Sequence, residues 1–115
     1  MKIGFIGCGN VGGKLSHSLL RNGFDLMVRD LDVLAAQPLL DQGATWAESP
    51  KQLAESCEII ITCLPSPAAC KEVMEADDGV LAGLSEGKVW MEMSTTDETE
   101  VRRIGQLVEK LGAFP

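Results

Sequence analysis

Short apolar segments alternate with amphipathic segments along the chain, and this alternation predicts its elements. Residues 2–6 form an apolar strand, after which Val11, Leu15 and Leu19 recur at four-residue spacing on one helix face. Further strands are predicted at 26–28, 44–46, 59–64 and 89–93, with a helical segment between each strand and the next. Strands that alternate with helices favour right-handed crossovers and a mainly parallel sheet of about five strands, with helices on both faces.

Local signals place the ends of the helices. Serine–proline pairs at 49–50 and 66–67 predict helix starts, because serine caps the first turn and proline fits its first position. Asp32 opens a helical segment that contains Pro38, and we expect the regular part of that helix to start at the proline. Gly112 ends the last helix, whose apolar stripe is Val101, Ile104, Val108 and Leu111.

Composition and charge narrow the class of protein. The chain has 115 residues, a hydrophobic fraction of 45% and a formal net charge of -7, which fits one globular domain. An acidic chain without a basic stripe is a poor ligand for nucleic acid or anionic membranes, so neither is an expected partner. No segment is long and apolar enough to span a bilayer, and residues 1–4 lack signal-peptide architecture. Together with the reduced cysteines described next, this predicts a cytoplasmic protein.

The four cysteines predict neither a metal site nor a disulfide framework. They stand at positions 8, 57, 63 and 70, with no Cys-x-x-Cys pair and with the single histidine, His17, nine residues from the nearest one. We expect reduced thiols that pack as small apolar groups. His17 lies off the apolar helix stripe, so exposure is expected for it rather than catalysis.

A glycine motif follows the first strand and opens the first helix. The segment reads Gly7-Cys8-Gly9-Asn10-Val11-Gly12, and these six residues are predicted to bind a dinucleotide. The first glycine allows the tight turn, the second lets main-chain amides approach the pyrophosphate, and the third lets the helix pack closely on the sheet. The free N–H groups of the helix start then hold the negative charges. This context predicts a Rossmann-type doubly wound fold.

Asp30 lies 18 residues after Gly12 and just beyond the second strand. A carboxylate there accepts hydrogen bonds from the ribose diol and repels a 2′-phosphate, so NAD is favoured and NADP is the less favoured alternative. Leu31 follows in the predicted cofactor site and adds no charge, and Arg29 points to the opposite face of the strand. A flavin or a methionine-derived cofactor is the remaining alternative. Asp30 could also cap a helix, a role that Asp32 could serve equally well.

Four segments, in order, resemble the β-hydroxyacid dehydrogenases, a family that includes 3-hydroxyisobutyrate dehydrogenases, semialdehyde reductases and, more distantly, 6-phosphogluconate dehydrogenase. The segments are residues 3–12, 61–66, 87–95 and 112–114. The resemblance implies hydride transfer between a nicotinamide cofactor and a short hydroxyacid. It also implies that Leu64 and Pro65 line the cofactor groove, that Thr95 lies near the nicotinamide, and that Ser94 binds the substrate carboxylate. Ser94 and Thr95 could alternatively form a helix-entry turn.

The chain departs from the family pattern at two points. Glu92 stands where the family has an aspartate before its Ser-Thr pair. The chain stops where the sixth strand should begin, so the C-terminal helical domain and the family's catalytic lysine are absent, and no catalytic residue is predicted. Lys88 and Lys110 do not stand in that lysine's context and are expected to be solvated.

The expected role is therefore the cofactor half of an oxidoreductase, without turnover of its own. The alternatives are a stand-alone nucleotide-binding module and a related imine or pyrroline reductase. An open fifth-strand edge, with Trp90 losing cover, predicts self-association into a homo-oligomer.

Overall fold

The computed structural model describes residues 1–7, 10–30, 32–64, 66–93 and 98–115. Its five strands form one sheet in the order β3-β2-β1-β4-β5, and all neighbouring strands run parallel. The strands are β1 (Lys2–Ile6), β2 (Asp25–Arg29), β3 (Thr45–Trp46), β4 (Ile59–Thr62) and β5 (Val89–Glu92). The predicted α/β class, parallel sheet and strand number are confirmed. The strands β4 and β5 end earlier than the apolar runs suggested.

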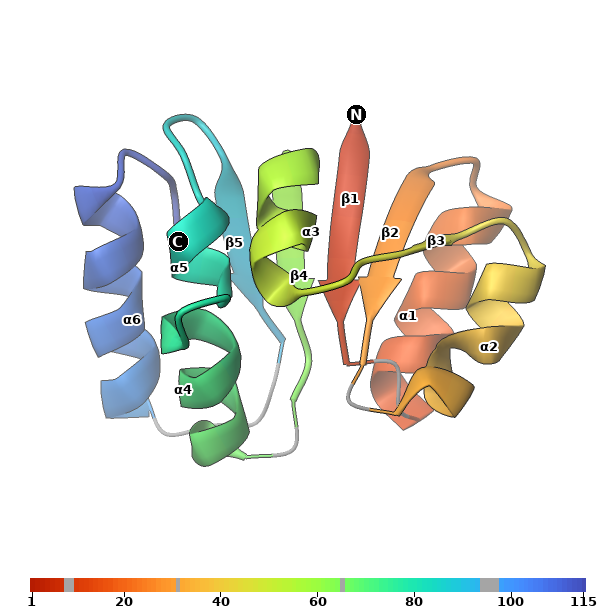
Figure 1. The fold of residues 1–115 in the computed structure, drawn as a ribbon, viewed down its shortest axis with the longest axis horizontal. Helices are drawn as coiled ribbons and strands as arrows, with labels where there is room; N and C mark the ends of the chain where they lie inside the picture. The colour runs from red at the N-terminus through yellow and green to blue at the C-terminus, as the bar shows by residue number, and fades with distance from the viewer. Residues whose placement is uncertain (8–9, 31, 65, 94–97) are drawn as a thin grey trace.

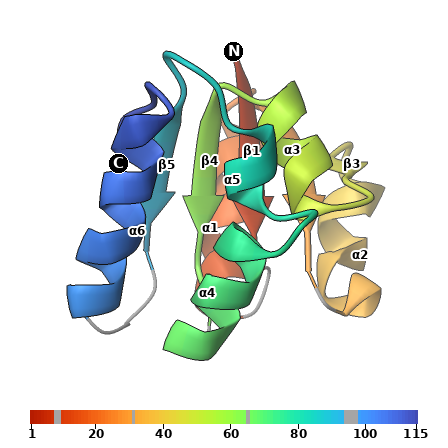
Figure 2. The ribbon, with the colours of Figure 1, turned by 60° about the vertical axis from the view of Figure 1, so that its left-hand side comes forward.

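In the described part of the chain, six helices cover both faces of this sheet (Figures 1 and 2). The helices α1 and α2 lie on one face, and α3, α4, α5 and α6 lie on the other. Their bounds are α1 (Asn10–Arg21), α2 (Val33–Asp41), α3 (Pro50–Ser56), α4 (Pro67–Glu75), α5 (Val80–Gly83) and α6 (Glu98–Lys110). The doubly wound arrangement follows from the strand order, because crossovers of one hand place helices on one face while the chain moves from β1 to β3 and on the other face as it crosses back to β4 and goes on to β5.

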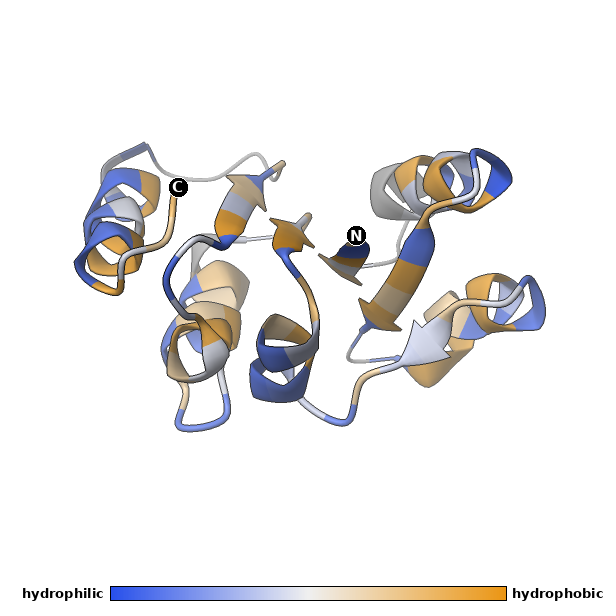
Figure 3. Cartoon of the chain, turned by 90° about the horizontal axis from the view of Figure 1, so that it is seen from above, coloured by the Kyte–Doolittle hydropathy of each residue, from blue (hydrophilic) through white to orange (hydrophobic). Residues whose placement is uncertain are grey.

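Strand alternation divides the core into two apolar clusters. In β1, Ile3 and Phe5 pack with α1 and α2, whereas Ile6 belongs to the cluster under α3 to α6. On both faces of the sheet, the buried strand residues are almost wholly apolar, as expected where helices cover both sides. Figure 3 shows this pattern: largely apolar strands run between helices that carry both apolar and polar residues.

Both serine–proline pairs start helices as predicted. The Ser49 hydroxyl accepts the N–H of Gln52 at 3.1 Å, and the Gln52 side chain accepts the N–H of Glu48 at 2.6 Å. The Ser66 hydroxyl accepts the N–H of Ala69 at 3.1 Å. These bonds satisfy main-chain donors that have no partner inside the helix, which fixes where α3 and α4 begin.

The expectation for Pro38 is wrong. The proline lies inside α2, which is already helical from Val33, and Asp32 caps that start by accepting the N–H of Leu34 at 3.0 Å. A proline in this position removes the hydrogen bond to the carbonyl four residues earlier. That carbonyl belongs to Leu34, whose residue surface is 72% exposed, so water can replace the missing donor.

The outer edge of β5 is partly covered by the last residues of the chain. Phe114 forms an isolated parallel bridge with Val89, donating its N–H to the carbonyl of Lys88 at 2.8 Å and accepting the N–H of Trp90 at 2.7 Å. Trp90 is 2% exposed, so the expected loss of its cover does not occur. Phe114 thus pairs with β5 at the point where the family pattern begins its sixth strand. Among the described residues, no helix is long and apolar enough to cross a membrane.

Candidate functional site

The carboxyl ends of the strands meet at one edge of the sheet, the lower edge in Figure 1. From β1 the chain winds outward through β2 to β3, and then crosses back so that β4 pairs with the other side of β1. The connections leaving β1 and β4 therefore diverge to opposite faces of the sheet. Such a switch point is where open α/β sheets bind ligands, and Gly7 and Cys63 lie directly at it.

Gly7 occupies a position that only glycine fits. Its φ is +100°, and a Cβ added there would lie 2.0 Å from the main-chain oxygen of Cys63. Its N–H donates to the carbonyl of Arg29 at 3.0 Å, which ties the turn to the end of β2. The first glycine of the motif thus turns the chain sharply between three parallel strands, as its spacing predicts.

The remainder of the glycine motif leads into α1. Cys8 and Gly9 lie outside the described residues, so their predicted contacts stay predictions. Asn10, Val11 and Gly12 form the first turn of α1, whose main-chain N–H groups have no acceptor within the helix. The positive end of α1 therefore begins at the switch point, which is the arrangement that binds anions.

The end of β2 brings the predicted ribose residue to the same edge. Asp30 accepts the N–H of Asp32 through Oδ1 at 3.0 Å, and Asp32 caps α2. The capping role left open between the two aspartates thus belongs to Asp32. Arg29 points away, donating from Nη1 to the carbonyls of Ala47 at 2.9 Å and Glu48 at 2.8 Å. Leu31 lies outside the described residues.

The connection after β4 supplies Leu64, which is half-buried and packs against the apolar cluster under α3 to α6. Gly7 and Leu64 are close, because a Cβ on Gly7 would lie 3.4 Å from a Leu64 methyl group. The structure therefore brings together the predicted groove residue and the first glycine of the motif. Pro65 lies outside the described residues, as do Ser94 and Thr95 after β5.

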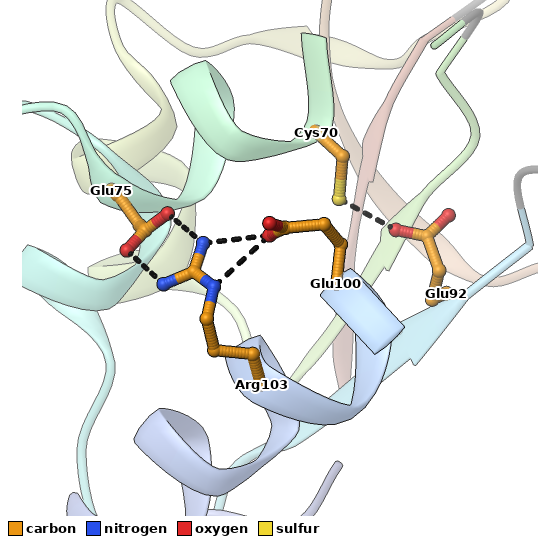
Figure 4. A network of polar contacts seen from close by, with 5 residues as sticks. All are labelled: Cys70, Glu75, Glu92, Glu100 and Arg103. Atoms are coloured by element: carbon orange, nitrogen blue, oxygen red, sulfur yellow. Dashed lines mark hydrogen bonds and ion pairs between the residues drawn. The ribbon is translucent and has the colours of Figure 1, made fainter. Parts of the chain in front are cut away.

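A chain of polar contacts that sequence reasoning missed runs beneath this edge. The indole N–H of Trp90 donates to Thr62 Oγ1 at 3.0 Å, and the Thr62 hydroxyl donates to Glu92 Oε2 at 2.8 Å. The Cys70 thiol lies 3.1 Å from the same carboxylate oxygen (Figure 4). The carboxylate of Glu92 thus links β5 to β4 and α4. Glutamate in place of the family's aspartate is long enough to reach α4, a contact that spacing alone does not reveal.

A second polar cluster joins α4 to α6, also drawn in Figure 4. Arg103 contacts both oxygens of Glu75 at 2.8 and 2.6 Å, and its Nη2 lies 2.8 Å from Glu100. These hydrogen bonds from Arg103 hold the pKa of the Glu75 carboxyl below its usual value. The cluster fixes the outer helices to each other and does not reach the switch point.

The described cysteines are free thiols, and two of them are buried. Burial raises the pKa of Cys57 to about 11. Burial, followed by the contact with Glu92, raises the pKa of Cys70 to about 12. Burial also raises the pKa of Cys63. Thiols of this kind stay protonated at neutral pH and are poor nucleophiles, so none of the three supplies a catalytic thiolate.

Two residues expected to be solvated make contacts instead. The Lys88 ammonium donates to the carbonyls of Ala54 and, at 2.9 Å, Glu55, and so caps the last turn of α3. His17 is half-buried, with Nδ1 3.2 Å from the side-chain oxygen of Gln42. Lys110 is exposed as expected. Lys88 thus links the start of β5 to α3, and His17 links α1 to the residue after α2.

A parallel sheet in the order 3-2-1-4-5, a glycine turn at its switch point and a helix start directly behind that turn define a Rossmann-type dinucleotide-binding domain. The family described as "NAD binding domain of 6-phosphogluconate dehydrogenase" matches residues 2–114, and the chain belongs to that family.

Known proteins that resemble the chain include a dehydrogenase and an imine reductase. Mitochondrial 3-hydroxyisobutyrate dehydrogenase of Mus musculus is 32% identical over 111 residues, which is 96% of this chain and 33% of that protein. The solved structure of Psf3 in complex with NADP+ and 2-OPP has a TM-score of 0.92 and 26% identity, covering 97% of this chain and 40% of that one. An imine reductase from Pseudomonas sp. has a TM-score of 0.82 and 25% identity, covering 97% and 38%. The chain thus spans about a third of the length of the curated relatives that it matches.

Proposed function

We propose that this chain holds the nicotinamide dinucleotide of an oxidoreductase that interconverts a short hydroxyacid and its aldehyde or ketone. The observation that carries the proposal is Gly7, which turns at the switch point with a φ of +100° and leaves no space for a side chain. The likeness to 3-hydroxyisobutyrate dehydrogenase supports the substrate class. When bound, the nicotinamide accepts or donates a hydride, and the protein binds, orients and shields it.

In this proposal each part of the edge contacts a different part of the dinucleotide. The turn and the start of α1 hold the diphosphate through main-chain N–H groups. Asp30 accepts hydrogen bonds from the adenosine ribose, and the connection after β4 lines the groove toward the nicotinamide. Ser94 would bind the carboxylate of the substrate. The proposed cofactor residues are Gly7, Cys8, Gly9, Asn10, Val11, Gly12, Asp30, Leu31, Leu64, Pro65 and Thr95.

We propose NAD rather than NADP as the cofactor. Asp30 carries a negative charge where the 2′-phosphate of NADP would lie, so the two would repel each other. The complex of Psf3 with NADP+ shows that a closely similar fold accommodates the phosphorylated cofactor. The preference for NAD over NADP therefore depends on side chains at the end of β2 and not on the fold.

A titration tests the proposal directly. Adding NADH to the purified chain should enhance the nicotinamide fluorescence with weak or moderate affinity, and NADPH should bind at least about tenfold more weakly. The chain on its own should give no turnover of 3-hydroxyisobutyrate, because none of its lysines stands in the catalytic context of the family. Absence of binding by either dinucleotide at millimolar concentration would contradict the cofactor role, and measurable turnover would contradict the predicted inactivity.

We also propose that the chain self-associates through the side of β5. Met91 and Met93 are 43% and 47% exposed there, and Phe114, which bridges the strand edge, is 60% exposed. Clustered large apolar side chains on a strand at the end of a sheet favour association.

A further inference from the structure

The last residue of β2 is Arg29, which precedes the acidic residue Asp30, and its side chain is held by another part of the chain. Arg29 donates from Nη1 to the carbonyl of Ala47 at 2.9 Å and to the carbonyl of Glu48 at 2.8 Å. Its Cζ lies 5.5 Å from the centroid of the Trp46 ring. We call the Arg29 guanidinium, the Trp46 ring and these two carbonyls the Arg29 clamp.

The clamp combines two kinds of attraction. Hydrogen bonds from a guanidinium to carbonyls are charge-assisted, and the electron-rich face of an indole attracts the same cation. The clamp also gives a hydrogen-bond donor to two carbonyls of the β3–α3 connection, which follow the last paired residue of β3. Moving the guanidinium elsewhere would break both hydrogen bonds and the ring contact at once.

The main chain of Arg29 shows why its side chain matters for the cofactor. Its carbonyl accepts the N–H of Gly7 at 3.0 Å, and Asp30 follows it immediately. Arg29 therefore lies between the turn proposed for the diphosphate and the carboxylate proposed for the ribose. An arginine in such a place could pair bidentately with a 2′-phosphate, which is the way in which guanidinium groups recognise phosphate.

We propose that the Arg29 clamp is a specificity device that withholds this cation from the 2′-phosphate of NADP. The inference rests on the proposed function, since it presupposes a dinucleotide at the end of β2. Discrimination against NADP then has two sources, the repulsion by Asp30 and the retention of Arg29 in the clamp. Arg29 is accordingly a residue that sets specificity through where it is held, without touching the preferred cofactor.

The test removes the two sources separately and compares the dissociation constants of NADH and NADPH by calorimetry. Asp30→Asn removes the repulsion and retains an oxygen that can accept the N–H of Asp32. Trp46→Leu, added to it, removes the ring and retains an apolar side chain. Arg29→Met, added third, removes the cation. The control is Arg102→Met, which removes an arginine from the exposed ion pair with Glu98 on α6.

In the Asp30→Asn background, Trp46→Leu should strengthen NADPH binding relative to NADH by about fivefold, because the loosened guanidinium can reach the phosphate. Adding Arg29→Met should abolish that gain. In the otherwise unchanged chain, Arg29→Met should leave the ratio of the two constants unaltered, as should Arg102→Met. If the clamp only stabilised the fold, Trp46→Leu in the Asp30→Asn background would lower the melting temperature and leave the ratio of the two dissociation constants unchanged.

Three results would overturn the inference. One is an unchanged ratio after Trp46→Leu in the Asp30→Asn background. Another is a selective loss of NADPH binding when Arg29→Met is the single substitution, because Arg29 would then already contact the phosphate. If Trp46→Leu fails to fold, Trp46→Phe replaces it, since a phenyl ring attracts the guanidinium less than an indole and should shift the ratio in the same direction by a smaller factor. The third result, failure of the unaltered chain to bind either dinucleotide, overturns the proposed function itself and the clamp with it.

Discussion

Gly7 must be glycine for two reasons, its backbone conformation and the lack of space beside it. The positive φ strains any residue with a side chain, and the overlap with the Cys63 carbonyl involves main-chain atoms that cannot turn aside. Its amide also links the turn to β2. Conformation, packing and the proposed ligand contact thus all depend on the absence of one carbon atom.

Gly7→Ala should therefore destabilise the chain by at least about 2 kcal/mol and abolish NADH binding. Chemical denaturation and the fluorescence titration measure the two effects. Gly23→Ala is the matched control, since Gly23 also has a positive φ, of 84°, but has no atom within 4 Å of an added Cβ. It should lower stability less and leave NADH binding intact. Equal affinity for NADH in Gly7→Ala would show that this turn does not hold the diphosphate.

The buried thiols predict how stability depends on alkaline pH. Burial raises the pKa of Cys57 to about 11 and that of Cys70 to about 12 in the folded chain, from 9.0 for an ordinary thiol. Above pH 9 the unfolded chain releases protons that the folded chain keeps, so the free energy of unfolding falls as the pH rises. Below pH 9 both states are protonated and these groups cause no change.

The melting temperature of Cys57→Ala and Cys70→Ala should thus fall less than that of the unaltered chain between neutral pH and about pH 10. The comparison uses the change with pH within each variant, because each substitution also leaves a cavity that lowers stability at every pH. Parallel pH profiles in all three proteins would show that these thiols do not govern the alkaline loss.

Among the elements, α3 is capped at both ends: side chains near its own start cap the first turn, and a side chain from a distant strand caps the last turn. Ser49 and Gln52 cap its first turn, and Lys88, at the start of β5, reaches the carbonyls of its last turn. A helix of seven residues is too short to be stable alone, so these caps and the packing of its buried side chains determine its stability.

Lys88→Met should cost about 1 kcal/mol of unfolding free energy, or about 4 °C in melting temperature, because two helix carbonyls lose a charged donor. Lys110→Met is the matched control, since Lys110 is exposed at the end of α6. Thermal unfolding of both variants measures the difference. An equal, small effect of the two substitutions would mean that Lys88 is replaceable by water.

The elements also show what the sequence can predict. Serine–proline pairs and apolar runs marked α3, α4 and all five strands, because these signals act within a few residues. The prediction for Pro38 was wrong because the cap at Asp32 starts the helix earlier, and Leu34, whose carbonyl loses its donor, is an exposed residue at which water can take the donor's place. The prediction that Lys88 is solvated was wrong because its partners lie more than thirty residues away in the chain.

The candidate site shows the same division between local and distant signals. The glycine spacing and Asp30 identified the edge at which the strands end, since both are local patterns. The links from Thr62 to Glu92 and from Arg29 to the β3–α3 connection were not predictable, because they depend on which strands become neighbours and how long each side chain is.

For the whole molecule, the two faces of the sheet differ at β5. Trp90 is covered on the face of α3 to α6, whereas Met91, next along the strand, is 43% exposed on the other side. The helices α1 and α2 pack over β1 and β2 and leave this side of β5 open. The apolar side of β5 is the basis of the proposed self-association.

The joint substitution of Met91→Lys and Met93→Lys should therefore shift the chain toward the monomer in sedimentation velocity over a range of concentrations. The joint substitution of Val33→Lys and Leu34→Lys is the charge-matched control, because both residues are apolar and 48% and 72% exposed but lie on α2. Sedimentation of the unaltered chain as a monomer at every concentration would contradict the proposal.

The chain contains two tryptophans, and the fold places one in each apolar cluster. Trp90 is sealed beneath α3 to α6 with its indole bonded to Thr62, and Trp46 lies half-buried beside the Arg29 cation. The fluorescence of the two tryptophans should therefore differ in emission wavelength and in quenching by iodide. The molecule thus carries an optical probe on either side of its sheet, so an unfolding experiment can show whether the two halves of the interior melt together or in turn.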